Sequence, residues 1–109
     1  MTKEELLQRY AAGERDFSGA DLAKVDLNEA NLSGANLSGA DLNGTLLEEA
    51  NLSDANLSGA SLNAARLYNA NLSHANLSNA SLIYADLSHA RLDGANLKGA
   101  NTAQAKGLR

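Results

Sequence analysis

Leucine recurs at every fifth position over most of this chain. Sixteen leucines, with Phe17 opening the series, fill every fifth position from 17 to 97. A step of five turns by about 500° on an α-helix, so these leucines would spiral over every face. On a straight strand, an odd step sends alternate leucines to opposite faces. One shared interior therefore requires a chain that bends once in every five residues.

The outward positions repeat with a longer period of 20 residues. Serine follows leucine or phenylalanine on two tracks, 18-38-58-78 and 33-53-73. Asparagine precedes leucine on two more, 36-56-76-96 and 31-51-71. Four bends thus close one coil, and residues 20 apart should stack about 4.8 Å apart. The pattern predicts an all-β solenoid with leucine and alanine inside.

Four sides follow from this period, and each is named here by its leucine positions. Side one carries 17, 37, 57, 77 and 97; side two carries 22, 42, 62 and 82; side three carries 27, 47, 67 and 87; side four carries 32, 52, 72 and 92. Glycine, asparagine or aspartate often stands two residues after leucine, where the corner needs turn dihedrals.

The five-residue unit A-[N/D]-L-[S/T]-G, seen in NLSGANLSGA at 31–40, resembles the pentapeptide repeat family. The resemblance covers about four-fifths of the chain. It implies a right-handed quadrilateral β-helix, here of about four coils of 20 residues. The opening ELLQRYAAGERDFSGADL at 5–22 is similar to the start of short cyanobacterial members.

The two ends of the chain are expected to differ. Thr2 opens a T-x-x-E capping box, and an apolar face follows it, which predicts a capping helix over about 3–12 within an N-terminal segment 1–14. The β-helix should occupy 15–100 and a C-terminal tail 101–109. That tail either folds over the last coil or leaves it free to pair with a second chain as a homodimer.

Charge and composition narrow the cellular setting. The net charge is −4, which argues against direct binding of nucleic acid. No apolar run is long enough to cross a membrane, and the N-terminus lacks a signal-peptide core. Cysteine is absent. These observations predict a cytoplasmic protein without membrane contact.

No catalytic constellation stands out in the sequence. His74 and His89 occupy corner positions on different sides, where solvated side chains are expected. The serines are consensus residues of the repeat, and no histidine and aspartate are placed to activate one of them. We therefore expect no enzyme activity, no cofactor and no metal site.

Departures from the repeat gather on sides two and three. Apolar, aromatic and charged residues replace the usual asparagine, serine and glycine there, and stacking should bring them near one shared corner. The candidate interaction patch consists of Leu46, Glu48, Glu49, Arg66, Tyr68, Ile83, Tyr84 and Asp86. Aromatic and arginine side chains are typical anchors of protein interfaces. The alternative is drift on a tolerant surface, with an exposed Arg66–Asp86 ion pair of little energetic value.

Charge follows the same division. Over residues 15–100, sides two and three hold seven acidic and two basic side chains, whereas sides one and four balance. The sequence therefore favours a non-enzymatic scaffold that presents its irregular acidic sides to a protein partner. The alternative is a DNA-mimicking binder of an enzyme such as gyrase, because some members of the family resemble duplex DNA. The charge on these two sides is sparse beside that of duplex DNA, which carries one negative charge per roughly 1.7 Å of its axis.

Overall fold

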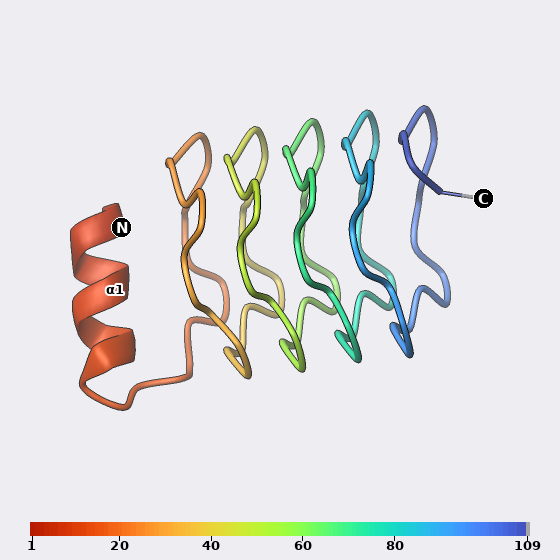
Figure 1. The fold of residues 1–109 in the computed structure, drawn as a ribbon. Helices are drawn as coiled ribbons and strands as arrows, with labels where there is room; N and C mark the ends of the chain where they lie inside the picture. The colour runs from red at the N-terminus through yellow and green to blue at the C-terminus, as the bar shows by residue number, and fades with distance from the viewer. Residues whose placement is uncertain (109) are drawn as a thin grey trace.

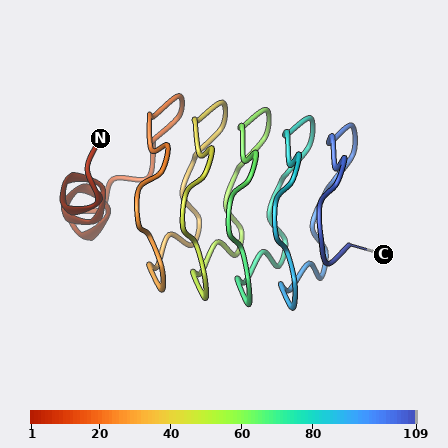
Figure 2. The same cartoon turned by 90° about the horizontal axis from the view of Figure 1, so that it is seen from above.

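A computed structural model describes residues 1–108 of the chain. Stacked coils form a column, with a single helix at its N-terminal end among the described residues (Figure 1). The molecule measures 37 × 23 × 22 Å. Seen from above, the helix is viewed end-on, so its axis lies across the column (Figure 2). The last described coil lies at the opposite end (Figure 1).

Strand pairing is limited to isolated parallel bridges that join residues 20 apart. They fall into four columns, which begin at Asp16, Asp21, Asp26 and Asn31. Each column belongs to one side, and each bridge lies at the residue before the leucine. The 20-residue period predicted from the sequence is therefore the register of the ladder.

Each five-residue unit forms its own corner and two bonds to the next coil. In one example, the Leu37 amide donates to Asn56 O at 2.7 Å and the Gly39 amide to Ser58 O at 2.9 Å. The Ala40 amide closes the turn by donating to Leu37 O at 3.1 Å. Backbone groups thus find partners at most bends, as a chain without long strands requires.

The second residue after each leucine has a positive φ throughout the column. This holds at every fifth position from Gly19, with φ 69°, to Gln104, with φ 60°. Glycine adopts this region without a steric penalty, whereas other residues are strained there. The corners therefore bend in the same sense at each step, as the sequence pattern predicts.

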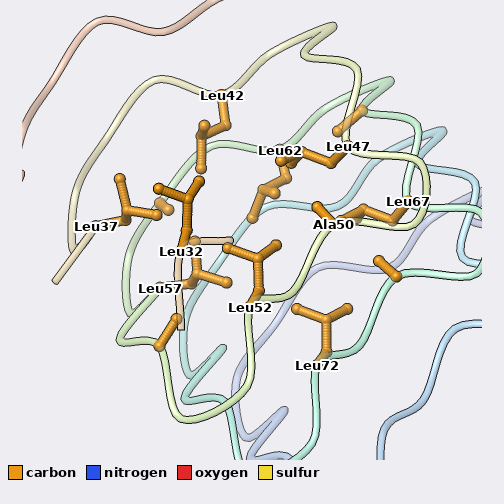
Figure 3. Packing of buried hydrophobic residues seen from close by; sticks show 14 of the residues in the cluster. Leu32, Leu37, Leu42, Leu47, Ala50, Leu52, Leu57, Leu62, Leu67 and Leu72 are labelled. Carbon is orange, nitrogen blue, oxygen red and sulfur yellow. The ribbon is translucent and has the colours of Figure 1, made fainter. Parts of the chain in front are cut away.

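The core contains the repeated leucine and alanine side chains, which point inward from all four sides (Figure 3). Phe17 and the leucines at every fifth position from Leu22 to Leu87 are at most 2 % exposed. Thr45, which replaces an inward alanine, is fully buried and donates its hydroxyl to Leu22 O at 2.7 Å. The polar exception is thus satisfied inside the core.

The helix α1, Lys3–Ala11, covers the first coil. The Thr2 side chain accepts from the Glu5 amide at 3.1 Å at its start. Leu6 is fully buried. The Tyr10 hydroxyl donates to Ser33 O at 2.6 Å. The helix therefore shields apolar core and ties itself to an otherwise open edge of the ladder.

The opposite end continues the ladder beyond Ala100, where the repeat pattern suggests an end. Asn101 forms a bridge with Ser81, and Lys106 with Asp86. Residues 101–106 therefore extend sides two and three instead of folding over the last coil. Leu92 and Leu97 near this end are only partly buried.

Candidate protein-interaction surface

The asparagine or aspartate before each leucine has a structural role. Its side-chain oxygen accepts a hydrogen bond from the amide two residues later, as from Ser58 to Asn56 at 3.0 Å and from Ser38 to Asn36 at 3.1 Å. This Asx bond satisfies the one amide of each unit that the ladder leaves free. The preference for these two residues thus follows from backbone chemistry.

Three departures from this rule are compensated by the preceding coil. Leu46, Ser61 and Ser81 replace the usual acceptor. The amides of Glu48, Asn63 and Ile83 instead donate to side-chain oxygens of residues 20 earlier, namely Asn28 at 2.8 Å, Asn43 at 2.9 Å and Asn63 at 3.0 Å. An asparagine just after leucine in one coil therefore supplies the acceptor missing in the next.

Arginine at the acceptor position has no such compensation. Within residues 1–108, the amides of Tyr68 and Asp93 donate to no protein atom, and Arg66 and Arg91 stand two residues before them. The corresponding amides of the other units between 18 and 103 all have a side-chain acceptor. Neither arginine can accept a hydrogen bond, because a guanidinium is only a donor.

Side three brings together one track of the candidate patch. Leu46, Arg66 and Asp86 form consecutive bridges, preceded by Asp26 and followed by Lys106. Leu46 and Asp86 are half-buried and Arg66 is exposed. The stacking predicted for these three residues is therefore present.

The prediction of one shared corner was wrong. The turn closed by the Ala70 amide and Leu67 O contains Tyr68, and the equivalent turn in the preceding coil contains Glu48 and Glu49. Ile83 and Tyr84 lie instead in the turn closed by the Ala85 amide and Leu82 O, at the other edge of side three. The candidate residues thus span the whole of side three and both of its corners. A period of 20 residues fixes the track of a residue but does not place separate tracks together.

The Arg66–Asp86 ion pair that belonged to the drift alternative is not formed, since Arg66 pairs with Glu48. Its Nε lies 3.7 Å from Glu48 Oε2, with the side chains 59 % and 37 % exposed. At this exposure and distance the pair contributes little stability. The hydroxyl and amide of Ser88 lower the pKa of Asp86, with smaller effects from Lys106 and Arg66.

The sequence did not indicate that His89 belongs to this surface. Its ring meets that of Tyr68 edge-to-face, with centroids 5.4 Å apart. Tyr68 is 41 % exposed, and Tyr84 at the other corner is 68 % exposed. These are the two exposed large hydrophobic side chains within residues 1–108. The 20-residue period stacks position 89 on position 69, not on position 68. The contact of His89 with Tyr68 therefore depends on the direction of the two side chains, which the sequence does not give.

Charge on sides two and three is divided along the column. The first two coils carry six acidic side chains against Lys24, whereas the later coils carry Arg66 and Lys106 against Asp86. Lys106 lies on side three because the ladder continues past residue 100. These two sides therefore have a net charge of −4 over residues 15–108, with the acidic part nearer α1 and the aromatic part further along.

Residues 1–108 lack the features of other kinds of site. That part of the molecule has no pocket and no group of three metal-ligating side chains. No helix in this range has the length and apolarity that crossing a membrane requires.

The pentapeptide repeat model matches this chain over residues 16–48, 29–67 and 60–99, with eight repeat copies. The chain belongs to the pentapeptide repeat family. Members of this family form right-handed, four-sided β-helices, with which the four columns of bridges agree. None of the curated proteins compared with the chain matches it.

Solved structures of other members are similar to this one. A pentapeptide repeat protein from the thylakoid lumen of Arabidopsis thaliana superposes with a TM-score of 0.82 at 30 % identity, over 87 % of this chain and 67 % of its own. HetL of Nostoc sp. strain PCC 7120, involved in heterocyst differentiation regulation, gives 0.71 at 40 % identity, over 94 % and 48 %. A further Nostoc member gives 0.56 at 38 % identity, over 99 % and 88 %. This chain thus spans about half the length of HetL.

Proposed function

We propose that this pentapeptide repeat protein is a non-enzymatic scaffold that binds a protein partner through side three and its two corners. The observation that carries the proposal is the exposure of Tyr68 and Tyr84 at the two edges of a side whose centre holds Arg66. Tyrosine and arginine are the residue types that most often dominate binding energy at protein interfaces. A non-enzymatic role is consistent with HetL, a related member involved in regulation.

The column is well suited to present such a surface. Backbone bonds connect each coil to the next, and the corners repeat the same dihedrals, so the outward side chains sit on a rigid frame. A preformed surface lowers the ordering cost of binding. We propose about four right-handed coils for this frame and a cytoplasmic location for the protein. A homodimer through the C-terminal coil, where Leu92 and Leu97 are half-buried, belongs to the same proposal.

Charge favours a scaffold over a DNA mimic. A duplex as long as the 37 Å molecule would carry about 20 phosphate charges. Sides two and three carry a net charge of only −4 over residues 15–108. The expected partner instead has a basic region facing the first two coils and pockets for the tyrosines further along. Binding dominated by a steep loss with salt would favour the mimic.

The test compares the wild type with a variant whose surface is returned to the repeat consensus. The variant combines Leu46→Asn, Arg66→Asn, Tyr68→Ser, Ile83→Ser and Tyr84→Gly. These five substitutions restore the consensus residues of the repeat, so the column should stay folded. Both proteins serve as baits in lysate, and each captured protein is then purified and titrated by calorimetry.

A control variant carries Asp54→Gly, His74→Gly and Asp93→Ser, which alter the exposed corners of side four. The proposal expects a partner that binds wild type and control alike and loses at least about tenfold in affinity for the consensus variant, which is typical of losing anchor residues. Equal binding by all three proteins would show that side three is not the interface.

A further inference from the structure

We propose that Arg66 and the backbone amide of Tyr68 form a recognition point for a carboxylate of the partner, an aspartate or glutamate side chain. This inference rests on the proposed function and specifies the chemistry of one contact. It starts from the one hydrogen bond that the neighbouring units of side three form and that this unit lacks.

The Tyr68 amide occupies a position that normally binds an oxygen. In the preceding unit of side three the Glu48 amide donates to Asn28, and in the following unit the Ser88 amide donates to Asp86 at 3.0 Å. The Tyr68 amide points along the same side without a protein acceptor within residues 1–108. A donor so placed can donate to an external oxygen without any rearrangement of the ladder.

Arg66 adds a second donor at the same place. Its Cβ stands where the side chain of an asparagine would begin, two residues before the Tyr68 amide. A carboxylate near that amide would also meet the guanidinium, and such charge-assisted hydrogen bonds are about twice as strong as neutral ones. The guanidinium is available, because its ion pair with Glu48 is exposed and long at 3.7 Å.

The chain itself contains an example of the contact between guanidinium and carboxylate. At the other uncompensated unit, Arg91 stands two residues before Asp93, and the Asp93 carboxylate lies 3.5 Å from the Arg91 guanidinium. Position 68 holds tyrosine instead of aspartate, so this position supplies no carboxylate of its own, and Arg66 has only the exposed contact with Glu48 at 3.7 Å. The edge-to-face pair of Tyr68 and His89 forms an apolar border beside it.

Neighbouring charges favour a carboxylate over a phosphate. Glu48, Glu49 and Asp86 lie on or beside the same track and repel a dianion more than a monoanion. One amide and one guanidinium also make a small donor set, which suits the two oxygens of one carboxylate. The partner is therefore expected to place a single acidic side chain here, apart from its basic region.

Acetate is the probe for the test, added to ¹⁵N-labelled full-length protein at constant ionic strength with chloride as the reference. We expect saturable NMR shifts of the Tyr68 amide and Arg66 Nε in the millimolar range. The Ser73 amide, which already donates to Asn71 at 3.0 Å, is the internal control. Equal responses of the Tyr68 and Ser73 amides would overturn the inference.

Two variants move the result in opposite directions. Arg66→Asn removes the guanidinium and supplies an internal acceptor, so it should abolish the Tyr68 response while the melting temperature stays the same or rises. Glu48→Gln removes the competing carboxylate and should tighten acetate binding about two- to fivefold. An unchanged response in Arg66→Asn, or tighter binding of inorganic phosphate than of acetate, would overturn the carboxylate assignment.

The outcomes of the two tests are distinguishable. If acetate does not bind but a partner still depends on the tyrosines, the scaffold function stands and the carboxylate inference fails. If acetate binds as expected but no partner distinguishes the consensus variant, the scaffold function fails and the recognition point serves another ligand.

Discussion

Asn63 should stabilise the column by supplying a hydrogen-bond acceptor to the next coil. Its side-chain oxygen accepts from the Ile83 amide at 3.0 Å and from the Ser81 hydroxyl at 2.5 Å. The substitution Asn63→Ser removes both bonds and leaves the half-buried Ile83 amide without an acceptor. With a net value of about 1 kcal/mol for each bond, the expected loss is about 1–2 kcal/mol. For a domain of this size the corresponding fall in melting temperature is about 4–12 °C.

A second substitution should repair the first. Ser81→Asn places a side-chain oxygen two residues before Ile83, the geometry by which Asn76 accepts from Ser78 at 3.0 Å. In the Asn63→Ser background this change should recover about 1 kcal/mol, whereas alone it should have little effect. The coupling energy of the double-mutant cycle is therefore expected to be about 1 kcal/mol.

Urea unfolding followed by circular dichroism measures the four stabilities of the cycle. Hydrogen exchange at the Ile83 amide reads the contact directly, since its protection should fall in Asn63→Ser and return in the double variant. Asp54→Asn, at an exposed corner outside these bonds, is the control, because both residues tolerate its positive φ of 60°. Additive effects, with no recovery of stability or protection in the double variant, would refute compensation between coils.

Three further predictions follow from the corners, the core and the acidic side chains. Gly59→Ala should lower the free energy of unfolding by about 1 kcal/mol because of its φ of 65° alone, since an added Cβ meets no atom within 4 Å. Ala64→Gly should raise it by a similar amount, and urea unfolding measures both changes. Leu57→Ala, in the buried core, should cost about 2–5 kcal/mol. Leu97→Ala, half-buried near the end, should cost clearly less by the same measurement, and equal losses would contradict the gradient in packing. The folded pKa of Asp86 lies below its ordinary value, so its carboxylate contributes stability at neutral pH that is lost as pH falls through the folded pKa. In thermal melts, Asp86→Asn should therefore lose less stability than the wild type between about pH 7 and about pH 3.

The sequence predicts the backbone of this protein better than its surface contacts. The leucine period, the 20-residue register and the turn positions all follow from the need to bury one apolar row with a bending chain. These features depend on local geometry repeated many times, so one rule covers every coil. The extension of the ladder to Lys106 was missed because Thr102 replaces leucine there and Gly107 occupies the next leucine position, although their backbone continues the same path.

Contacts between side chains of different tracks could not be obtained in this way. Arg66 has carboxylates one coil before and one coil after it, and the repeat pattern does not decide between them. Arg66 pairs with Glu48 because its guanidinium points away from its own track, 46-66-86, toward the corner that contains Glu48. The contact of Tyr68 with His89 likewise joins two different tracks. Such contacts depend on rotamers, which a repeat pattern does not specify.

The hydrogen-bond pattern separates departures that the fold has absorbed from the two that it has not, at Arg66 and Arg91, of which only Arg66 lies in the candidate patch. Leu46 and Ser81 also break the repeat, but Asn28 and Asn63 restore the lost bonds, as expected when a surface changes without selection for binding. Arg66 removes an acceptor that nothing within residues 1–108 replaces, so its presence brings no benefit to the backbone. Arg66 thus costs a backbone hydrogen bond and lies beside exposed aromatic side chains. A residue that lowers stability in this way is expected where selection acts on binding. Leu46 is therefore the candidate that drift explains best, and Arg66 with Tyr68 is where a loss of partner binding should be largest.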